Sequence, residues 1–171
     1  RYLFEHIGVG GKVNWAIAGR SEKKLAVLKS SLGSSADSLS VIVADASDGV
    51  ALTTMCQSAR VIASTVGPYA LYGEPLVKAC AENGTDYCDL CGEAYWIKAM
   101  ILKYSDAAKA SGARIVSCCG FDSIPSDLGV HFLQRQGKQR FGKYFDNIKL
   151  AVNTMKGGAS GGTLASMIEA V

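Results

Sequence analysis

The chain has 171 residues, of which 49% are hydrophobic and 19% are charged, and its formal net charge is +3. This composition is too apolar for a disordered chain and indicates one domain with a packed core, with room for part of a second. The net charge is too small to predict nucleic-acid binding, and no apolar run approaches the length of a membrane span.

Six cysteines stand at positions 56, 80, 88, 91, 118 and 119, and most of them lie within apolar runs. This placement favours buried thiols in a reducing, intracellular compartment over a disulfide framework. Cys88 and Cys91 form a C-x-x-C pair. A zinc site needs about four ligands, however, and the only other close pair is Cys118 and Cys119. We therefore expect small buried residues at these positions and no metal site.

Short apolar segments alternate with amphipathic segments, which is the pattern of strands followed by helices. The predicted strands cover residues 13–18, 41–44, 60–65, 86–90 and 113–118. The predicted helices cover residues 21–32, 47–59, 72–83, 93–111 and 126–136; strand character resumes at 147–154, and 163–171 resembles a helix start. This alternation predicts an α/β fold with a doubly wound parallel sheet.

The beginning of the chain does not match the beginning of such a sheet. A doubly wound nucleotide-binding fold starts with a strand, a glycine-rich turn and a helix whose N-terminus holds the pyrophosphate. Residues 1–7 instead resemble the end of a helix, and the glycines of residues 8–11 precede a strand, so we expect a turn there. We therefore predict a Rossmann-type sheet that lacks its first strand and its Gly-rich loop.

A change of composition marks a domain boundary. Residues 138–144 are basic and are typical of a surface connection, so we expect a new domain to begin near Phe145. The chain then divides into residues 1–144 and residues 145–171.

Loss of the first strand has an energetic consequence. In the usual order that strand is central, and its absence removes roughly four buried side chains at about 1.5–3 kcal/mol each. This sum is comparable to the whole stability of a domain, about 5–15 kcal/mol, and two strand edges are left unpaired. We therefore expect the isolated 171 residues to be unstable or prone to aggregation.

Four ordered motifs carry a family resemblance: AGRSEKKL (18–25), TVGPY (65–69), GTDYCDLCGE (84–93) and CGFDSIPSDLG (119–129). Together they resemble the saccharopine dehydrogenase-like oxidoreductases, a family that includes the bacterial trans-acting enoyl reductases. The resemblance covers essentially the whole chain and implies an NAD(P)-binding fold. Members of the family are much longer, with the Gly-rich loop before the position of Arg1 and a large mixed α/β domain after Val171. The resemblance therefore implies an internal fragment, an isoform or a partial stretch of such a protein. It would hold a truncated NAD(P)-binding Rossmann domain (1–144) and the start of a second α/β domain for substrate binding or dimerisation (145–171).

The residues that follow the first two predicted strands are candidate cofactor ligands. Arg20 stands where an arginine receives the 2′-phosphate of NADP and an acidic residue would bind the ribose of NAD, so we expect NADP. Ser21 either assists that phosphate or caps the following helix. Asp45 either reaches the adenine amino group or forms a helix-capping turn.

The turn after the third predicted strand holds Thr65, Gly67 and Pro68. Ligands of doubly wound folds bind outside the carboxyl ends of the strands, and Gly67 permits a close backbone approach. The resemblance places the nicotinamide half of NADP beside this turn. The alternative is a plain strand-to-helix turn.

Catalytic residues are not assigned by the sequence. Tyr87, Asp89 and Glu93 cluster around a strand end, where paired carboxylates do acid–base work or orient a substrate. Alternatively Glu93 opens the next helix, at its positive end. Residues 121–127 either line the substrate cleft or cap a helix through Asp122 or Ser123.

We expect an oxidoreductase that transfers a hydride from NADP to a lipid-type or enoyl substrate, incomplete and inactive in this chain alone. The alternative is a non-catalytic lipid-surface or scaffold protein with a vestigial nucleotide cleft. The expected partners are a small-molecule or lipid substrate, without nucleic acid or a membrane span, and the resemblance implies a homodimer of the full-length protein. It also implies association with membranes or lipid droplets. Trp15 is expected beside the cofactor crevice.

Overall fold

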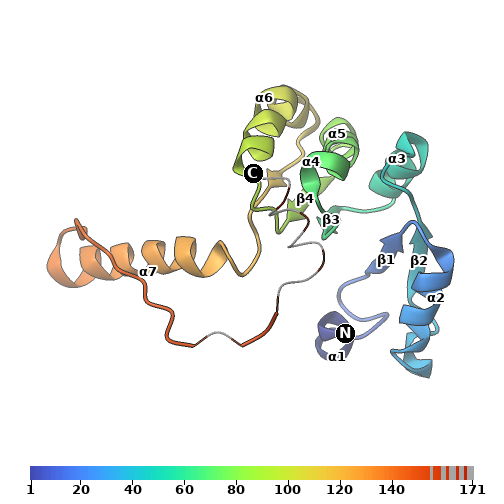
Figure 1. Cartoon of the computed structure of the whole chain (residues 1–171), viewed down its shortest axis with the longest axis horizontal. Coiled ribbons are helices and arrows are strands. Elements are labelled where there is room, and N and C mark those ends of the chain that lie inside the picture. The colour runs from blue at the N-terminus through green and yellow to red at the C-terminus, as the bar shows by residue number, and fades with distance from the viewer. Residues whose placement is uncertain (155, 159–160, 162–164, 166–167, 169–171) are drawn as a thin grey trace.

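The computed structural model describes residues 1–154, 156–158, 161, 165 and 168. It is an α/β structure in which short strands alternate with helices (Figure 1). The strands are β1 (Ala16–Gly19), β2 (Ser40–Val43), β3 (Val61–Ser64), β4 (Asp86–Asp89) and β5 (Ile115–Val116). The helices are α1 (Tyr2–His6), α2 (Glu22–Ser30), α3 (Gly49–Gln57), α4 (Tyr69–Tyr72), α5 (Glu74–Asn83), α6 (Ala94–Ser111) and α7 (Ile124–Phe141), with a 3-10 turn, η1 (Ser34–Ala36).

All neighbouring strands pair in parallel. β1 pairs with β2, while β4 lies between β3 and β5 in a second sheet. Within the described part of the chain no strand pairing joins the two sheets, so β1 and β3 each keep one edge without a strand partner. In the doubly wound order the second and fourth strands flank the first, and β1 and β3 hold those positions. The prediction of an α/β fold with parallel strands is confirmed.

Short polar side chains and glycines set the helix ends. Ser21 Oγ accepts a hydrogen bond from Lys24 N at 3.3 Å at the start of α2. Asp48 Oδ1 accepts from two backbone N–H groups in the first turn of α3, both at 3.0 Å. Gly84 and Gly112 end α5 and α6 in the left-handed conformation, with φ of 72° and 84°. The helix-capping alternative for Ser21 is therefore confirmed, and Asp48, Gly84 and Gly112 set three further helix ends.

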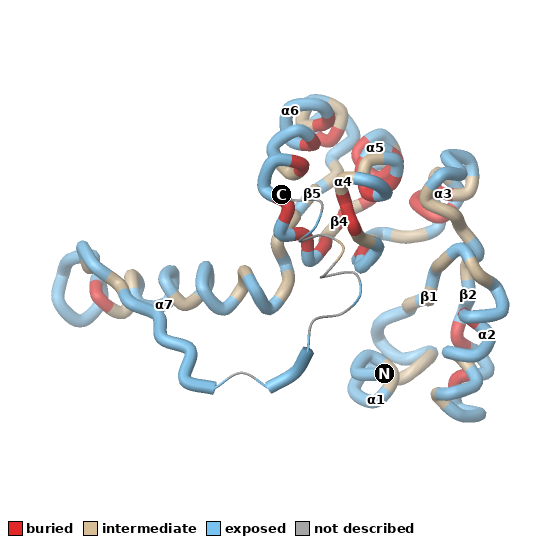
Figure 2. The backbone as a smooth tube through the Cα atoms, in the orientation of Figure 1, coloured by how far each residue is buried: buried red, intermediate tan, exposed pale blue. Residues whose placement is uncertain are grey.

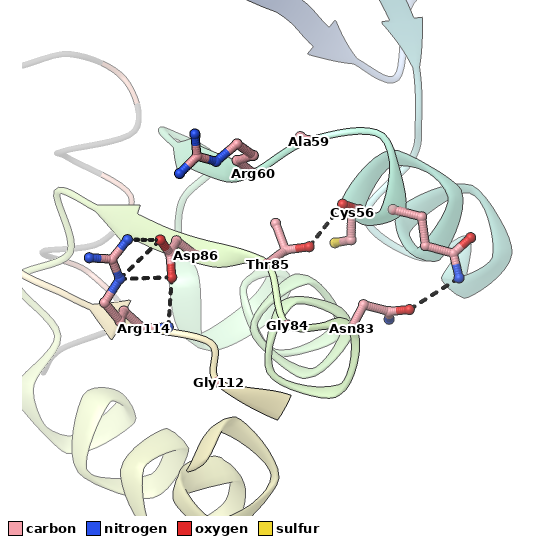
Figure 3. A pocket seen from close by; sticks show the side chains of 10 residues that line it. Cys56, Ala59, Arg60, Asn83, Gly84, Thr85, Asp86, Gly112 and Arg114 are labelled. Carbon is pink, nitrogen blue, oxygen red and sulfur yellow. Dashed lines mark hydrogen bonds and ion pairs between the residues drawn. The ribbon is translucent and has the colours of Figure 1, made fainter. Parts of the chain in front are cut away.

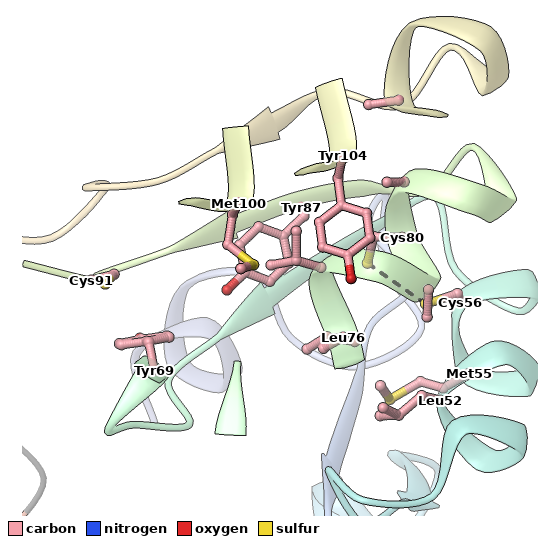
Figure 4. Close-up of a cluster of buried hydrophobic side chains, with 14 of the residues drawn as sticks. Leu52, Met55, Cys56, Tyr69, Leu76, Cys80, Tyr87, Cys91, Met100 and Tyr104 are labelled. Carbon is pink, nitrogen blue, oxygen red and sulfur yellow. Dashed lines mark hydrogen bonds between the residues drawn. The ribbon is translucent and has the colours of Figure 1, made fainter. Parts of the chain in front are cut away.

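The core lies around the three-stranded sheet. Figure 2 shows the buried positions concentrated in α3, α5, α6 and β4. Tyr87 of β4 is enclosed by side chains that include Cys56 from α3, Cys80 from α5 and Met100 from α6 (Figure 4). The two-stranded half is less well packed, since outside this cluster the buried hydrophobic residues of the described chain are Leu25, Ala36 and Leu39.

Helix α7 runs further than the sequence indicates. The basic residues 138–141 form its last turn, so the prediction of a surface connection throughout 138–144 is wrong. The helix continues because Gly137 leaves room for the ring of Phe145, which would lie 2.9 Å from a Cβ at that position. The Gln134 amide also bonds both backbone groups of Phe145, at 2.9 and 2.8 Å. No helix in the described residues is long and apolar enough to span a bilayer.

The predicted strand at residues 147–154 is wrong. These residues have no regular structure and Leu150 and Val152 are exposed, since no strand of the described chain pairs with them. The helix start predicted at 163–171 lies almost wholly outside the described residues. The domain boundary near Phe145 stays a prediction.

The unpaired edges of β1 and β3 lead us to predict that the isolated chain has low stability. Purified residues 1–171 should unfold over a broad temperature range and self-associate, because an unpaired parallel edge exposes backbone donors and acceptors. Calorimetry together with light scattering is the measurement. A single sharp two-state transition from a monomer would contradict this expectation.

Candidate functional site

The segments that follow the strands gather at the carboxyl edge of each sheet, because the strands are parallel. At the two-stranded sheet, Ala44 N donates to Gly19 O at 3.0 Å, and this bond sets Arg20 and Asp45 side by side just beyond the strand ends. The structure therefore brings together the two residues predicted to bind the adenosine end of NADP.

The guanidinium of Arg20 is exposed and has no ion pair or hydrogen bond within the described residues. Asp45 is already engaged, since its Oδ1 accepts from Ser47 Oγ at 2.7 Å and from Ser47 N at 2.9 Å. The Ser47 hydroxyl and backbone N–H lower the pKa of Asp45, and the charge of Arg20 lowers it further. Through Oδ1, Asp45 thus forms the turn that the second alternative predicts, while its other carboxylate oxygen makes no hydrogen bond in the described structure. Ser21 caps α2.

The turn after β3 is held from inside the fold. Tyr69 OH donates to Ser64 O at 3.1 Å, and Val66 N donates to Ser64 Oγ at 3.4 Å. The Gly67–Pro68 peptide is cis, and Pro68 precedes the short helix α4. Burial raises the pKa of Tyr69 to about 12, so its hydroxyl remains a proton donor at neutral pH. The backbone of residues 65–68 is therefore fixed, while the side chain of Thr65 is exposed.

Asp89 joins the ends of β4 and β5. Although it is only 4% exposed, its carboxylate accepts from Tyr87 OH at 2.9 Å, Cys91 N at 3.0 Å, Cys118 N at 3.1 Å and Ser117 Oγ at 3.3 Å. These donors replace the water that a buried carboxylate loses. Asp89 therefore fixes two loops at the edge of the sheet.

Glu93 is also buried, at 4% exposure, and its two oxygens accept from Tyr69 N at 2.9 Å and Ala70 N at 2.7 Å. The expectation that Glu93 opens the next helix is confirmed in position. It stands at the N-cap of α6, yet its side chain makes no cap bond to that helix and turns to α4 instead. Its oxygens are covered and occupied by backbone donors, which does not suit a general acid or base. The sequence gives no signal for this contact.

Residues 121–127 do not form the predicted cap. Ser123 occupies the N-cap of α7 without a side-chain hydrogen bond, and in the described structure Asp122 makes none either. Asp122 lies instead close to the backbone of Gly92 and Gly120. Phe121 is 78% exposed, so this segment has a free surface at the carboxyl edge of β5.

The two tryptophans lie at different edges of the fold. Trp15 precedes β1, at the amino end of the strand, and its Nε1 donates to Gly8 O at 2.7 Å. The expectation that Trp15 lies beside the cofactor crevice is wrong, because Trp15 precedes β1 whereas the candidate cofactor residues follow the carboxyl ends of the strands. Trp96 of α6 lies near the turn after β3, with its ring centroid 5.6 Å from that of Tyr69.

A pocket of about 430 Å³ opens at the opposite edge of the three-stranded sheet (Figure 3). Arg60, Thr85 and Arg114 line it, and each directly precedes a strand. Arg114 forms an ion pair with Asp86, and this guanidinium lowers the pKa of the Asp86 carboxyl. The pocket is therefore separate from the residues that follow the strands.

The cysteines are free thiols in the described structure. Cys56 and Cys80 are buried with their sulfurs 3.6 Å apart, and burial raises the pKa of Cys91 to about 12. Among the described residues, no group of three or more histidine, cysteine or acidic side chains could hold a metal ion.

Residues 1–116 match the family model described as the saccharopine dehydrogenase NADP binding domain. The chain belongs to this family. The expected cofactor, NADP, is therefore confirmed at the level of the family, and the role of Arg20 in binding it stays a prediction. The protein named trans-acting enoyl reductase from Mycobacterium ulcerans is 45% identical over 157 residues, covering 91% of this chain and 38% of that protein. The protein named lipid droplet localized protein from Caenorhabditis elegans is 47% identical over 127 residues, covering 72% of this chain and 30% of that protein.

A solved structure shares the fold. Apo saccharopine dehydrogenase (L-Glu forming) from Saccharomyces cerevisiae aligns with a TM-score of 0.52 at 17% identity, over 74% of this chain and 27% of that one. The present chain thus spans little more than a third of the length of the enoyl reductase relatives that it matches.

The described residues fit two parts of NADP. A guanidinium that is exposed and unpaired among them, at the end of β1, suits the 2′-phosphate, and the turn after β3 lies at the carboxyl edge of its sheet with Thr65 exposed. Within the described residues, no G-x-G-x-x-G segment follows a strand and opens a helix, which is the element that binds pyrophosphate in this fold.

The Asp89 network predicts a large loss of stability on substitution. Asp89→Asn removes the charge and one acceptor, so we expect the free energy of unfolding of the full-length protein to fall by about 2–3 kcal/mol. Asp106→Asn is the control, because that carboxylate is fully exposed. Urea unfolding measures both variants. Equal stability of the two, within about 0.5 kcal/mol, would contradict the assigned role.

The burial of the thiols predicts an order of alkylation. Cys119 is exposed, whereas Cys91 is covered and neutral at physiological pH because its pKa is about 12. The thiolate is the nucleophile, so iodoacetamide should modify native protein first at Cys119 and at Cys91 only after denaturation. Peptide mass spectrometry reads the order. Early modification of Cys91 in the folded protein would show that the C-x-x-C pair is reactive.

Proposed function

We propose that this chain is the cofactor-binding part of an oxidoreductase that transfers a hydride from NADPH to an enoyl or other lipid-type substrate. The observation that carries the proposal is the unpaired guanidinium of Arg20, set beyond β1 and beside Asp45. A 2′-phosphate would give this arginine the bidentate partner that the described residues do not supply.

Each residue after the strands has a proposed task. Arg20 binds the 2′-phosphate, while Ser21 holds the helix start beside it. The free oxygen of Asp45 accepts from the adenine amino group. Thr65, Gly67 and Pro68 form the surface against which the nicotinamide half of the cofactor lies.

The cofactor, when bound, supplies the hydride, so the protein has mainly to position the reactants and exclude water. The rigid backbone of residues 65–68 serves that positioning, since Tyr69 and Ser64 fix it from inside the fold. We assign no residue of this chain to proton transfer, because Asp89 and Glu93 already accept hydrogen bonds from groups of the fold.

The substrate class and location rest on the relatives. One is named for enoyl reduction and another for lipid droplets, so we propose an enoyl or lipid substrate and association with a lipid droplet or membrane surface. Residues 1–144 would form the cofactor domain and residues 145–171 would begin a domain for substrate or dimer contacts. A homodimer of the full-length protein and a reducing intracellular compartment belong to the same proposal.

A second candidate function is that of a non-catalytic lipid-surface or scaffold protein whose nucleotide cleft is vestigial. The observation that favours it is the engagement of both buried carboxylates near the strand ends, which leaves neither for acid–base chemistry. Cofactor binding separates the two functions, because a vestigial cleft has no need to retain affinity or preference for NADPH.

The role of Arg20 predicts cofactor selectivity. In the full-length protein, Arg20→Ala should weaken NADPH binding about 10- to 100-fold, because a charge-assisted contact to the 2′-phosphate is lost, and should leave NADH binding within about twofold. Titration calorimetry measures both cofactors. Arg60→Ala is the matched control, since this exposed arginine precedes β3 at the opposite edge.

Two outcomes would count against the proposal. Equal losses for NADPH and NADH in Arg20→Ala would refute the 2′-phosphate contact. No binding of either cofactor at about millimolar concentration by the unmodified protein would favour the non-catalytic function.

A further inference from the structure

The short helix α4 begins with two backbone donors that its own turn does not satisfy. Leu71 N and Tyr72 N bond to Pro68 O, at 3.2 and 3.1 Å, but the N–H groups of Tyr69 and Ala70 have no carbonyl partner within the helix. The first N–H groups of any helix need such partners from elsewhere. Here the partner is the carboxylate of Glu93, which accepts from Tyr69 N at 2.9 Å and from Ala70 N at 2.7 Å.

Glu93 reaches these donors from the loop after the neighbouring strand. It lies between β4 and α6, and its own backbone N–H bonds to Cys91 Sγ at 3.3 Å. The residue is 4% exposed, so its two acceptor oxygens are taken up by the start of α4 in place of water. The carboxylate therefore ties the loop after β4 to the turn after β3.

We propose that Glu93 is a positioning residue, whose carboxylate fixes the turn of residues 65–68 in the place that the nicotinamide half of NADP requires. This inference rests on the proposed function, and it adds a role for a residue that does not touch the cofactor. Hydrogen bonds to an ionised acceptor are stronger than those between neutral groups, so the carboxylate holds α4 more firmly than an amide would.

The surrounding contacts indicate why this bond matters for the turn. Tyr69 supplies both its N–H to Glu93 and its hydroxyl to Ser64 O, so it is fixed at two points on either side of residues 65–68. Trp96, one turn into α6, packs near the Tyr69 ring, with centroids 5.6 Å apart. A change at Glu93 therefore reaches the turn through the backbone of Tyr69, without altering any group exposed to the cofactor.

The decisive variant is Glu93→Gln in the full-length protein. Glutamine keeps the shape, but one of the two N–H groups then faces an amide NH₂ instead of an acceptor. The matched control is Glu82→Gln on α5, an exposed glutamate whose ion pair with Lys78 spans 4.0 Å. Three quantities are measured in each: amide hydrogen exchange of residues 65–72, unfolding by urea, and affinity for NADPH and for NADH.

We expect Glu93→Gln to raise the exchange rate of the Tyr69 and Ala70 amides by about tenfold or more, and to weaken NADPH and NADH by the same factor, about tenfold. The equal factor is the diagnostic result, because the turn lies at the nicotinamide half, which the two cofactors share. Glu82→Gln should change neither the exchange rates of these amides nor the affinities for NADPH and NADH. Glu93→Asp keeps the charge but has a shorter reach, so its cofactor affinity should lie between those of wild type and Glu93→Gln.

The inference is overturned if Glu93→Gln lowers only the stability and leaves both affinities unchanged, since Glu93 then has a structural role alone. Rapid exchange of the Tyr69 and Ala70 amides in wild type would also overturn it, and this measurement needs no variant to fold. Failure of wild type to bind either cofactor would instead refute the proposed function together with this inference.

Discussion

Parallel strand pairing is the constraint on which the rest of this molecule depends. It collects the segments that follow strands at one edge of each sheet and the segments that precede strands at the other. Arginines at the two edges have different surroundings as a result. Arg20, beyond the end of β1, is exposed and has no ion-pair partner in the described part of the chain, whereas Arg114, just before β5, is paired with Asp86. The first edge has a cation free for a ligand, and at the second edge one of the two pocket arginines is neutralised within the fold.

Buried carboxylates give the ligand-facing edge its rigidity. Burying such a group is costly unless donors replace its water, and both Asp89 and Glu93 have those donors from backbone and hydroxyl groups. Asp89 connects the ends of β4 and β5, and Glu93 connects the loop after β4 to the turn after β3. The loops at this edge of the three-stranded sheet are therefore held relative to one another, which suits a surface that must position a cofactor.

The sequence predicts the alternation of elements because hydrophobic periodicity, N-cap residues and helix-ending glycines are local signals, as at Ser21, Asp48 and Gly84. It fails where tertiary contacts decide. The contact of Glu93 with α4 joins residues 23 and 24 positions apart, and no local pattern reports it. α7 outlasts its predicted end because Phe145 folds back over Gly137. Residues 147–154 have the composition of a strand without a partner strand. For the candidate site, the closeness of Arg20 and Asp45 was predictable because each follows one strand of a parallel pair.

We infer above that the carboxyl edge of these strands binds NADP, and a crystal structure of the full-length protein with NADPH would locate the cofactor. We expect the 2′-phosphate to contact the Arg20 guanidinium and the nicotinamide half to lie beside Gly67. A dinucleotide bound instead in the pocket lined by Arg60 and Arg114, or bound with its 2′-phosphate away from Arg20, would refute this inference.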